Sequence, residues 1–298
     1  MFDNDKTNLK EQFLRDYTYT YYYDDKGKKL KNHEHFIFIS NFQIRKIRTS
    51  KHLYIDGTFI KPKGFTELII ILYHDDELNI RSPGCYILLN NKSEISYTKV
   101  FKKFRKIISI ENSREFALQT YTTDFETALV NSLKKIFPNA RRGGCYYHYV
   151  KNIRQYAKKH YLIKYRENKK EISSSKISTF IREVCLFPYK YHKNPNIIEE
   201  TFDTYDNGTD LFLNFINYFN KYWKPYFING ELDYAYLTKN QRSNSYIENY
   251  NKRIKLQLAN YFDGRSISIV EWPIFLKFIK DEEEYYEAKA TILKKKTN

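Results

Sequence analysis

The order of β-prone and helical segments between residues 52 and 137 restricts the fold of this chain more than any other feature. Three β-prone runs come first, and turns rich in Pro, Gly and Asp separate them. These runs cover residues 52–60, 66–73 and 85–89. A helical pattern, another β-prone run and a second helical pattern follow, over about 97–108, 117–121 and 125–137. The sequence therefore predicts three hairpin-connected strands and then helix, strand, helix and strand.

This sequence of elements is how an RNase H-like sheet is connected. The first three strands would be antiparallel, and crossover helices would supply the parallel remainder. We therefore predict an α/β fold in which helices flank a mixed five-stranded sheet.

The segments on either side of this pattern differ from it. Residues 1–50 suggest a short helix followed by a hairpin, and residues 149–237 carry helical patterns without a clear strand. Long amphipathic helices return from about residue 241. The predicted domains are an N-terminal segment, a core in two pieces, and an all-helical insertion that interrupts the core before its last helices. They cover residues 1–50, 51–148 plus 238–298, and 149–237.

Composition excludes several classes of protein. Aromatic residues make up 18% of the chain, far more than an intrinsically disordered chain contains. The longest apolar run, Leu68–Tyr73, is too short to cross a membrane, and residues 1–6 do not resemble a secretory signal. The three cysteines lie far apart, which argues against a disulfide scaffold and suits a reducing compartment.

The charge balance points to a polyanionic partner. The chain has 51 basic and 35 acidic residues, a net charge of +16, which favours binding to nucleic acid. An AT-rich genome would also raise the lysine content, so the charge alone leaves both explanations open.

Asp56 is a carboxylate within an apolar strand. Strand alternation places Tyr54, Asp56 and Thr58 on one face. A carboxylate there needs a metal, hydrogen bonds or water as a partner. The alternative is an exposed position on an edge strand.

Asp124 stands where a predicted strand passes into a helix. Ligands of α/β sheets bind at such strand ends. The alternative is a structural role, because Asp is a favoured helix N-cap.

Glu248 lies near the start of the first amphipathic helix after the insertion. Ser245-x-x-Glu248 fits a capping box, so one reading of Glu248 is structural. Ile247, Tyr250, Ile254 and Leu258 would form the buried stripe of this helix. The adjacent stripe would present one acid and two cations, and its residues are Asn244, Glu248, Asn251, Lys252 and Lys255.

Several short segments occur in an informative order. They are Asp56-Gly57-Thr58-Phe59; Thr123-Asp124-Phe125-Glu126 with Ala128; Phe137-Pro138-Asn139-Ala140; Gly144-Cys145-Tyr146-Tyr147-His148; and Arg242-Ser243-Asn244-Ser245-x-x-Glu248-x-x-Asn251. Together they resemble the Mutator-like (MULE) transposase domain of the DDE/RNase H-like transposase superfamily. The spacings agree with that family, with 124 − 56 = 68 residues between the aspartates and 248 − 124 = 124 before the glutamate. The family places an all-helical insertion in the second interval.

The resemblance implies a DDE-type nuclease and strand transferase with Asp56, Asp124 and Glu248 as catalytic and metal-binding residues. Two Mg²⁺ or Mn²⁺ ions about 4 Å apart would activate the attacking oxygen and stabilise the leaving oxygen. The partners would be DNA, as transposon ends and target, and a second copy of the chain in a homodimer, but no membrane. The implied location is nuclear. The residues expected to contact DNA are Arg242, Lys252, Arg253, Lys255 and Trp223.

Four further residues belong to this set or lie near it. Cys145 and His148 resemble the C-x-x-H pair of several eukaryotic cut-and-paste transposase groups. We expect them to pack beside the active site, because two ligands do not complete a structural zinc site. Direct contact with DNA or metal is the alternative. Asn244 precedes Ser245 where the family has two asparagines. For Trp223, stacking on an unpaired base and burial in a core both fit the pattern.

Family members often carry zinc-binding modules before and after this core, and the sequence contains neither. We therefore expect a truncated copy, a fragment or a lineage that binds DNA differently.

Two other functions fit the sequence. A domesticated relative that binds DNA or regulates without cutting is the main alternative to an active transposase. An RNase H-like nuclease for RNA hybrids or junctions is the other, and the helical insertion speaks against it.

Overall fold

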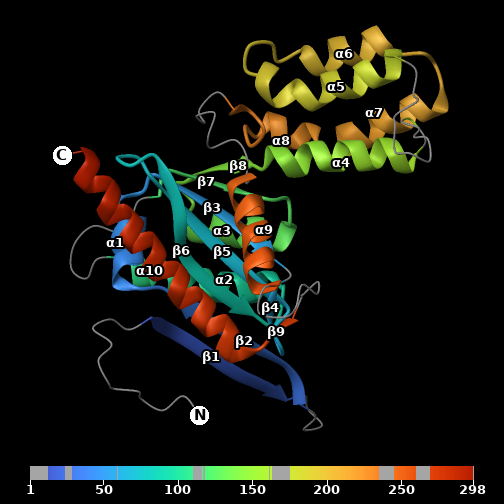
Figure 1. Cartoon of the computed structure of the whole chain (residues 1–298). Coiled ribbons are helices and arrows are strands. Elements are labelled where there is room, and N and C mark those ends of the chain that lie inside the picture. Colours follow the sequence, from blue (N-terminus) through green and yellow to red (C-terminus); the bar gives the residue numbers. More distant parts are fainter. Residues whose placement is uncertain are drawn as a thin grey trace, which may run out of the picture. The chain divides into compact units, whose positions relative to one another are not determined.

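The structure is a computed structural model, and it describes residues 13–23, 29–58, 60–109, 116, 118–160, 162, 175–234, 245–259 and 269–297. The chain divides into two compact units (Figure 1). The first unit consists of Met1–Tyr121, Glu126–Ala140 and Ser245–Asn298, and the second of Thr122–Phe125 and Arg141–Asn244. The predicted domain boundaries stay predictions.

A seven-stranded sheet has the strand order β1-β2-β6-β5-β3-β7-β8. Its strands are β1 (Leu14–Tyr23), β2 (Lys29–Phe38), β3 (His52–Thr58), β5 (Glu67–Asp75), β6 (Ile80–Leu89), β7 (Thr120–Thr123) and β8 (Arg141–Gly144). The pairs β1–β2, β2–β6, β5–β6 and β3–β5 are antiparallel. Two short strands, β4 (Lys61–Pro62) and β9 (Ile269–Val270), pair in parallel as a separate sheet.

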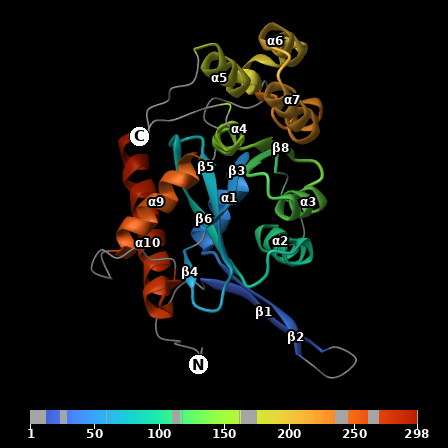
Figure 2. The same cartoon turned by 90° about the vertical axis from the view of Figure 1, so that its right-hand side faces the viewer.

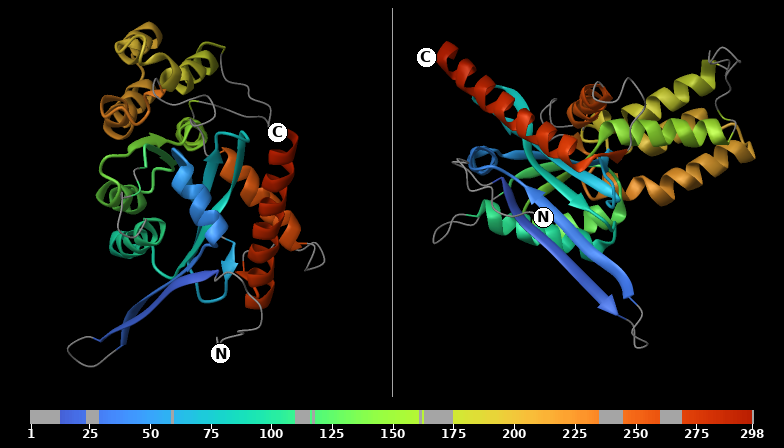
Figure 3. Two further views of the ribbon diagram at one scale, coloured as in Figure 1. Left: turned by 90° about the vertical axis from the view of Figure 1, so that its left-hand side faces the viewer. Right: turned by 60° about the horizontal axis from the view of Figure 1, so that its bottom comes forward.

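The α/β class with a mixed sheet flanked by helices is confirmed, but the predicted strand number of five is too low. The five predicted strands are contiguous in the order β6-β5-β3-β7-β8, which is compatible with an RNase H-like fold. The hairpin of β1 and β2 extends the same sheet, because β2 pairs with β6 at Phe36–Leu88 and the neighbouring positions (Figure 3). A sheet edge exposes unpaired backbone groups, so a β-prone run elsewhere in the chain can add to it.

Helices cover both faces of the sheet in the first unit (Figure 2). On one face lie α1 (Asn41–Thr49), α2 (Glu94–Ile108) and α3 (Thr127–Ile136), and on the other lie α9 (Ser245–Ala259) and α10 (Trp272–Thr297). Each layer has its own apolar core. Ile55, Ile69 and Phe101 belong to the core beneath α1–α3. Tyr54, Ile70 and Ile254 belong to the core beneath α9 and α10.

The second unit is built mainly from helices around an aromatic core. Its helices are α4 (Tyr146–Lys159), α5 (Ser175–Lys190), α6 (Ile197–Tyr205), α7 (Asp210–Tyr222) and α8 (Lys224–Ile228). Their core includes Phe180, Phe187, Phe215, Phe219 and Trp223. Between residues 149 and 234, every regular element that the structure describes is a helix, in line with the predicted all-helical character of this region.

Two local features differ from the expectations. The sequence interpretation missed α1, although Ser40 and Gln43 form the capping box at its start. It also expected a turn between the β-prone runs at 66–73 and 85–89, but the part of that interval from residue 80 onward lies within β6 (Ile80–Leu89). Pro83 is tolerated there because β2 pairs only with Tyr86–Leu89, so the strand has an open side at this proline. The helix expected at the beginning of the chain falls largely on residues 1–12, outside the described residues.

Helices of the kind that cross membranes are absent from the described parts of the chain, since none is both long and apolar enough.

Truncation of the central core should destabilise the first unit strongly. Ile71 on β5 is fully buried, and Ile71→Ala should lower the free energy of unfolding by about 2–5 kcal/mol. Ile95 is 61% exposed on α2, and Ile95→Ala should change it by less than about 0.5 kcal/mol. Urea unfolding of both variants measures the difference. Equal losses would contradict the position of β5 in the core.

Candidate active site

Asp56 lies on a central strand. This strand, β3, lies between β5 and β7 in the sheet. Asp56 pairs with Ile70 of β5, and only 3% of the residue is exposed. The alternative of an exposed edge position is therefore wrong. Leu53 and Ile55 face the core beneath α1–α3, whereas Tyr54 faces the core beneath α9 and α10. By strand alternation Asp56 shares the face of Tyr54.

Helix α9 packs on that face of the sheet. Tyr250, Ile254 and Leu258 are buried there with Tyr54, as the predicted apolar stripe requires. Glu248 precedes Tyr250 by two residues within α9. The structure therefore brings the backbone of the Glu248 helix to the face that carries Asp56. The side chains of residues 245–248 lie outside the described part of the chain, as do Arg242 and Asn244, so the capping box stays a prediction.

A buried polar cluster holds α9 against α10 and the sheet. The Tyr250 hydroxyl lies 2.5 Å from the Tyr86 hydroxyl and donates to Glu282 at 2.9 Å. The Arg253 guanidinium binds both carboxylate oxygens of Glu282 and donates to the Tyr286 hydroxyl at 3.1 Å. Burial raises the pKa of Tyr250, so its hydroxyl remains protonated. Arg253 thus has a structural partner within the unit, which makes it a weaker candidate for DNA binding than the exposed Lys252 and Lys255.

Asp124 follows β7 directly and belongs to the second unit. The next helix, α3, has Glu126 as its N-cap, so the alternative that Asp124 caps this helix is wrong. Arg142 fixes the backbone here, because its guanidinium donates to the Asp124 carbonyl oxygen and also pairs with the Glu231 carboxylate. Arg142 and Glu231 are both buried. The sequence analysis did not predict this pair, because its two members lie 89 residues apart and share no local pattern.

Phe125 anchors the residue after Asp124 in the core of the second unit. Its ring lies 4.9 Å from the Trp223 ring and 5.0 Å from the Tyr226 ring, centroid to centroid. Gly144 allows this approach, since a Cβ at that residue would lie 2.7 Å from the Phe125 ring. Trp223 is only 4% exposed, and its indole N–H donates to the Tyr218 hydroxyl at 2.8 Å. This burial favours the core alternative for Trp223 over stacking on DNA.

Cys145 and His148 lie at the start of α4, beside the strand that precedes Asp124. Cys145 is fully buried as the N-cap of α4, and its backbone N–H donates to the Thr123 carbonyl at 3.0 Å. His148 is partly exposed on the first turn. The expected role of the two residues beside an active site stays a prediction.

The donor chemistry of the predicted residues fits a hard divalent cation. Asp56, Asp124 and Glu248 offer carboxylate oxygens only, which Mg²⁺ and Mn²⁺ prefer. A buried carboxylate such as Asp56 is costly without compensation. Among the side chains that the structure describes, which exclude Glu248, no cluster of three or more metal-binding residues is found.

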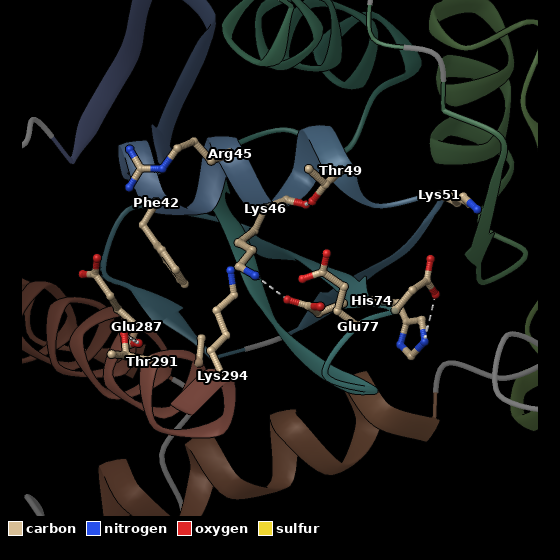
Figure 4. Close-up of a pocket in the computed structure, with 13 residues that line it drawn as sticks. Phe42, Arg45, Lys46, Thr49, Lys51, His74, Glu77, Glu287, Thr291 and Lys294 are labelled. Atoms are coloured by element: carbon tan, nitrogen blue, oxygen red, sulfur yellow. Dashed lines mark hydrogen bonds and ion pairs between the residues drawn. The ribbon is translucent and has the colours of Figure 1, made fainter. Parts of the chain in front are cut away.

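A separate pocket of about 630 Å³ lies in the first unit, between α1, the end of β5 and α10 (Figure 4). Lys46 and Asp75 form an ion pair of 2.5 Å in it. Burial opposes ionisation of Asp75, but the hydrogen bonds from Lys46 and the Leu78 N–H outweigh it and lower the pKa. Its lining is mixed in charge and includes none of the predicted site residues.

Breaking the Arg142–Glu231 pair should be costly. Arg142→Met would leave the buried Glu231 carboxylate without its cation and lower the free energy of unfolding by about 3–5 kcal/mol. The matched control is Lys224→Met, because Lys224 and Glu199 form a solvent-exposed pair whose loss should cost less than about 1 kcal/mol. Thermal and urea unfolding measure both. If the two substitutions lower the free energy of unfolding by similar amounts, Arg142 does not hold the backbone at Asp124 as argued above.

Two comparisons with known proteins bear on this site. A search of curated proteins finds no match. Residues 52–152, about a third of the chain, match the model of the MULE transposase domain, so the resemblance drawn from the motifs is confirmed there. The matched segment contains Asp56, Asp124, Cys145 and His148.

Proposed function

We propose that this chain carries the catalytic domain of a DDE-type DNA transposase, which cuts DNA phosphodiesters and joins the freed end to target DNA. One observation carries the proposal. Within the segment that matches the MULE transposase domain, Asp56 is buried on the central strand β3, and Asp124 directly follows β7, its neighbour in the sheet.

Contacts between the first residues of β3 and β7 support a common role for the two aspartates. The Thr120 N–H donates to the Lys51 carbonyl at 3.2 Å, and the His52 Nδ1 lies 2.7 Å from the Thr120 hydroxyl. Asp56 is five residues after Lys51 and Asp124 is four residues after Thr120. The two strands therefore run nearly equal lengths from paired beginnings to their aspartates.

Glu248 would complete the set from α9, which packs on the face of Asp56. Three carboxylates in one site repel one another, so they favour bound cations. Two bound Mg²⁺ or Mn²⁺ ions would supply activation of the attacking oxygen and stabilisation of the leaving oxygen. The carboxylates themselves would hold and orient the ions, and the buried surroundings of Asp56 would exclude water.

The exposed Lys252 and Lys255, one turn apart on α9, would hold the phosphate backbone without reading bases. We extend the same role to Arg242. Action on transposon ends and target DNA, a nuclear location and a homodimer complete the proposal. The net charge of +16 supports a polyanionic partner.

Cleavage should depend on divalent metal and on both aspartates. DNA carrying the terminal repeats of the element should be nicked with Mg²⁺ or Mn²⁺, and EDTA should abolish nicking. Asp56→Asn and Asp124→Asn should reduce it to the level without metal, because each removes a charged oxygen donor. Asp76→Asn, at a side chain 55% exposed, is the matched control and should leave nicking unchanged. Equal nicking by wild type and both site variants would instead favour the non-cutting DNA-binding alternative.

DNA affinity should weaken with salt and depend on α9. Replacing Lys252 and Lys255 by Gln should reduce the slope of log affinity against log salt by about 2, one unit for each lost phosphate contact. Lys102→Gln with Lys106→Gln is the matched control, since both are exposed on α2, on the opposite face of the sheet. Fluorescence anisotropy over a salt series measures the slopes. The same slope in both double variants would remove α9 as the DNA surface.

A further inference from the structure

We propose that Lys92 is a positioning residue that ties the Asp56 strand to the segment after Asp124, through Glu67 and Glu126, and thereby sets the affinity of the active site for its divalent cation. This inference rests on the proposed function. The four charged and hydroxyl groups that carry it, Glu67, Lys92, Tyr97 and Glu126, all lie in the first unit.

Glu67 packs against the backbone next to Asp56. A Cβ at Gly57 would lie 1.9 Å from the Glu67 Oε1 atom, so the carboxylate occupies the space that a side chain would fill. Gly57 follows Asp56 on β3, and adjacent residues of a strand face opposite sides. The Glu67 carboxylate therefore supports β3 from the face opposite to the Asp56 side chain.

Lys92 connects Glu67 to the second aspartate segment. Its Nζ atom lies 2.8 Å from Glu67 Oε1 and 3.3 Å from Glu126 Oε2. Glu126 is two residues beyond Asp124. Although Glu126 is the N-cap of α3, its side chain makes no capping hydrogen bond. Its carboxylate is directed instead to Lys92 and Tyr97.

Tyr97 closes the network from α2. Its hydroxyl lies 2.5 Å from Glu67 Oε2 and 2.9 Å from Glu126 Oε1. A hydroxyl has one proton, so it cannot donate fully to two carboxylates at once. Without the Lys92 ammonium, the two carboxylates would repel each other across this hydroxyl. Lys92 is thus the group that keeps them together.

The charges are held in a partly desolvated setting. The Glu67 side chain is 4% exposed, whereas those of Lys92 and Glu126 are 32% and 29% exposed. Burial raises the pKa of Glu67, and hydrogen bonds from Lys92 and Tyr97 offset part of that rise. A buried carboxylate that loses its cation is strongly disfavoured, so the geometry of β3 at Gly57 depends on Lys92.

The arrangement explains why a network on one face could affect a site on the other. Groups that orient metal ligands without touching the metal typically change metal affinity by about 10- to 100-fold when removed. Lys92 would act in this way on two ligands together, since β3 carries Asp56 and the chain reaches Asp124 two residues before Glu126.

The test measures Mn²⁺ binding to the full chain by electron paramagnetic resonance of free Mn²⁺, alongside nicking of terminal-repeat DNA. Lys92→Met should raise the Kd for Mn²⁺ by about 10-fold or more, with nicking partly recovered at high Mn²⁺. Lys92→Arg keeps a cation between the carboxylates and should restore binding close to wild type. Tyr97→Phe, which removes only the hydroxyl, should raise the Kd by a smaller factor.

The matched control is Lys46→Met, which removes the largely buried ion pair with Asp75 elsewhere in the first unit. It should lower thermal stability without changing the Kd for Mn²⁺. All binding is measured well below the melting temperature of each variant, as judged by circular dichroism. If Lys92→Met does not fold, Tyr97→Phe and Lys92→Arg carry the comparison.

The outcomes separate this inference from the proposed function. The inference alone is overturned if the wild-type chain binds Mn²⁺ and Lys92→Met has the same Kd. If Lys92→Met does not fold, the same Kd in Tyr97→Phe overturns it. A loss of Mn²⁺ affinity in Lys46→Met equal to that in Lys92→Met also overturns it, because the effect would then follow stability. A wild-type chain that binds no Mn²⁺ overturns the proposed function and the inference with it.

Discussion

The burial of a carboxylate in the middle of the sheet is the constraint on which the rest of the structure depends. β3 has β5 and β7 as neighbours and a helical layer on each face, so Asp56 at 3% exposure is almost cut off from bulk water. Placing a charge there is unfavourable unless cations or hydrogen bonds compensate it. The surroundings of β3 are organised accordingly, with α9 on the face of Asp56 and Glu67 behind Gly57.

Charged groups that are buried or partly buried lie beside each segment that carries a predicted acid. Glu67 and Lys92 lie beside β3, Arg142 and Glu231 hold the Asp124 backbone, and Glu282 holds α9 through Tyr250 and Arg253. A buried ion pair adds little net stability over apolar packing of the same volume. Its hydrogen bonds are directional, however, so these groups determine the orientation of the segments more than their stability.

Periodicity in the sequence predicted the elements of the core well. Alternation assigned Tyr54 and Ile55 to opposite faces of β3, and the helical stripe of Tyr250, Ile254 and Leu258 is buried as expected. Both patterns arise from local backbone geometry, which repeats every 2 residues in a strand and every 3.6 in a helix. The hairpin before residue 40 was recognised locally, but its addition to the same sheet depends on the distant pairing of β2 with β6.

The roles of individual polar residues were harder to predict. Arg253, which we expect to contact DNA, also pairs with Glu282 of another helix, and Trp223 is enclosed by Phe125 and Tyr149. Residue type and spacing by themselves thus determined the α/β class, the strands and helices of the core, and the resemblance of residues 52–152 to the MULE transposase domain. Only the tertiary structure decided which partner each charged group meets, because Lys92 with Glu126 and Arg142 with Glu231 are 34 and 89 residues apart, and no local pattern encodes contacts at such separations.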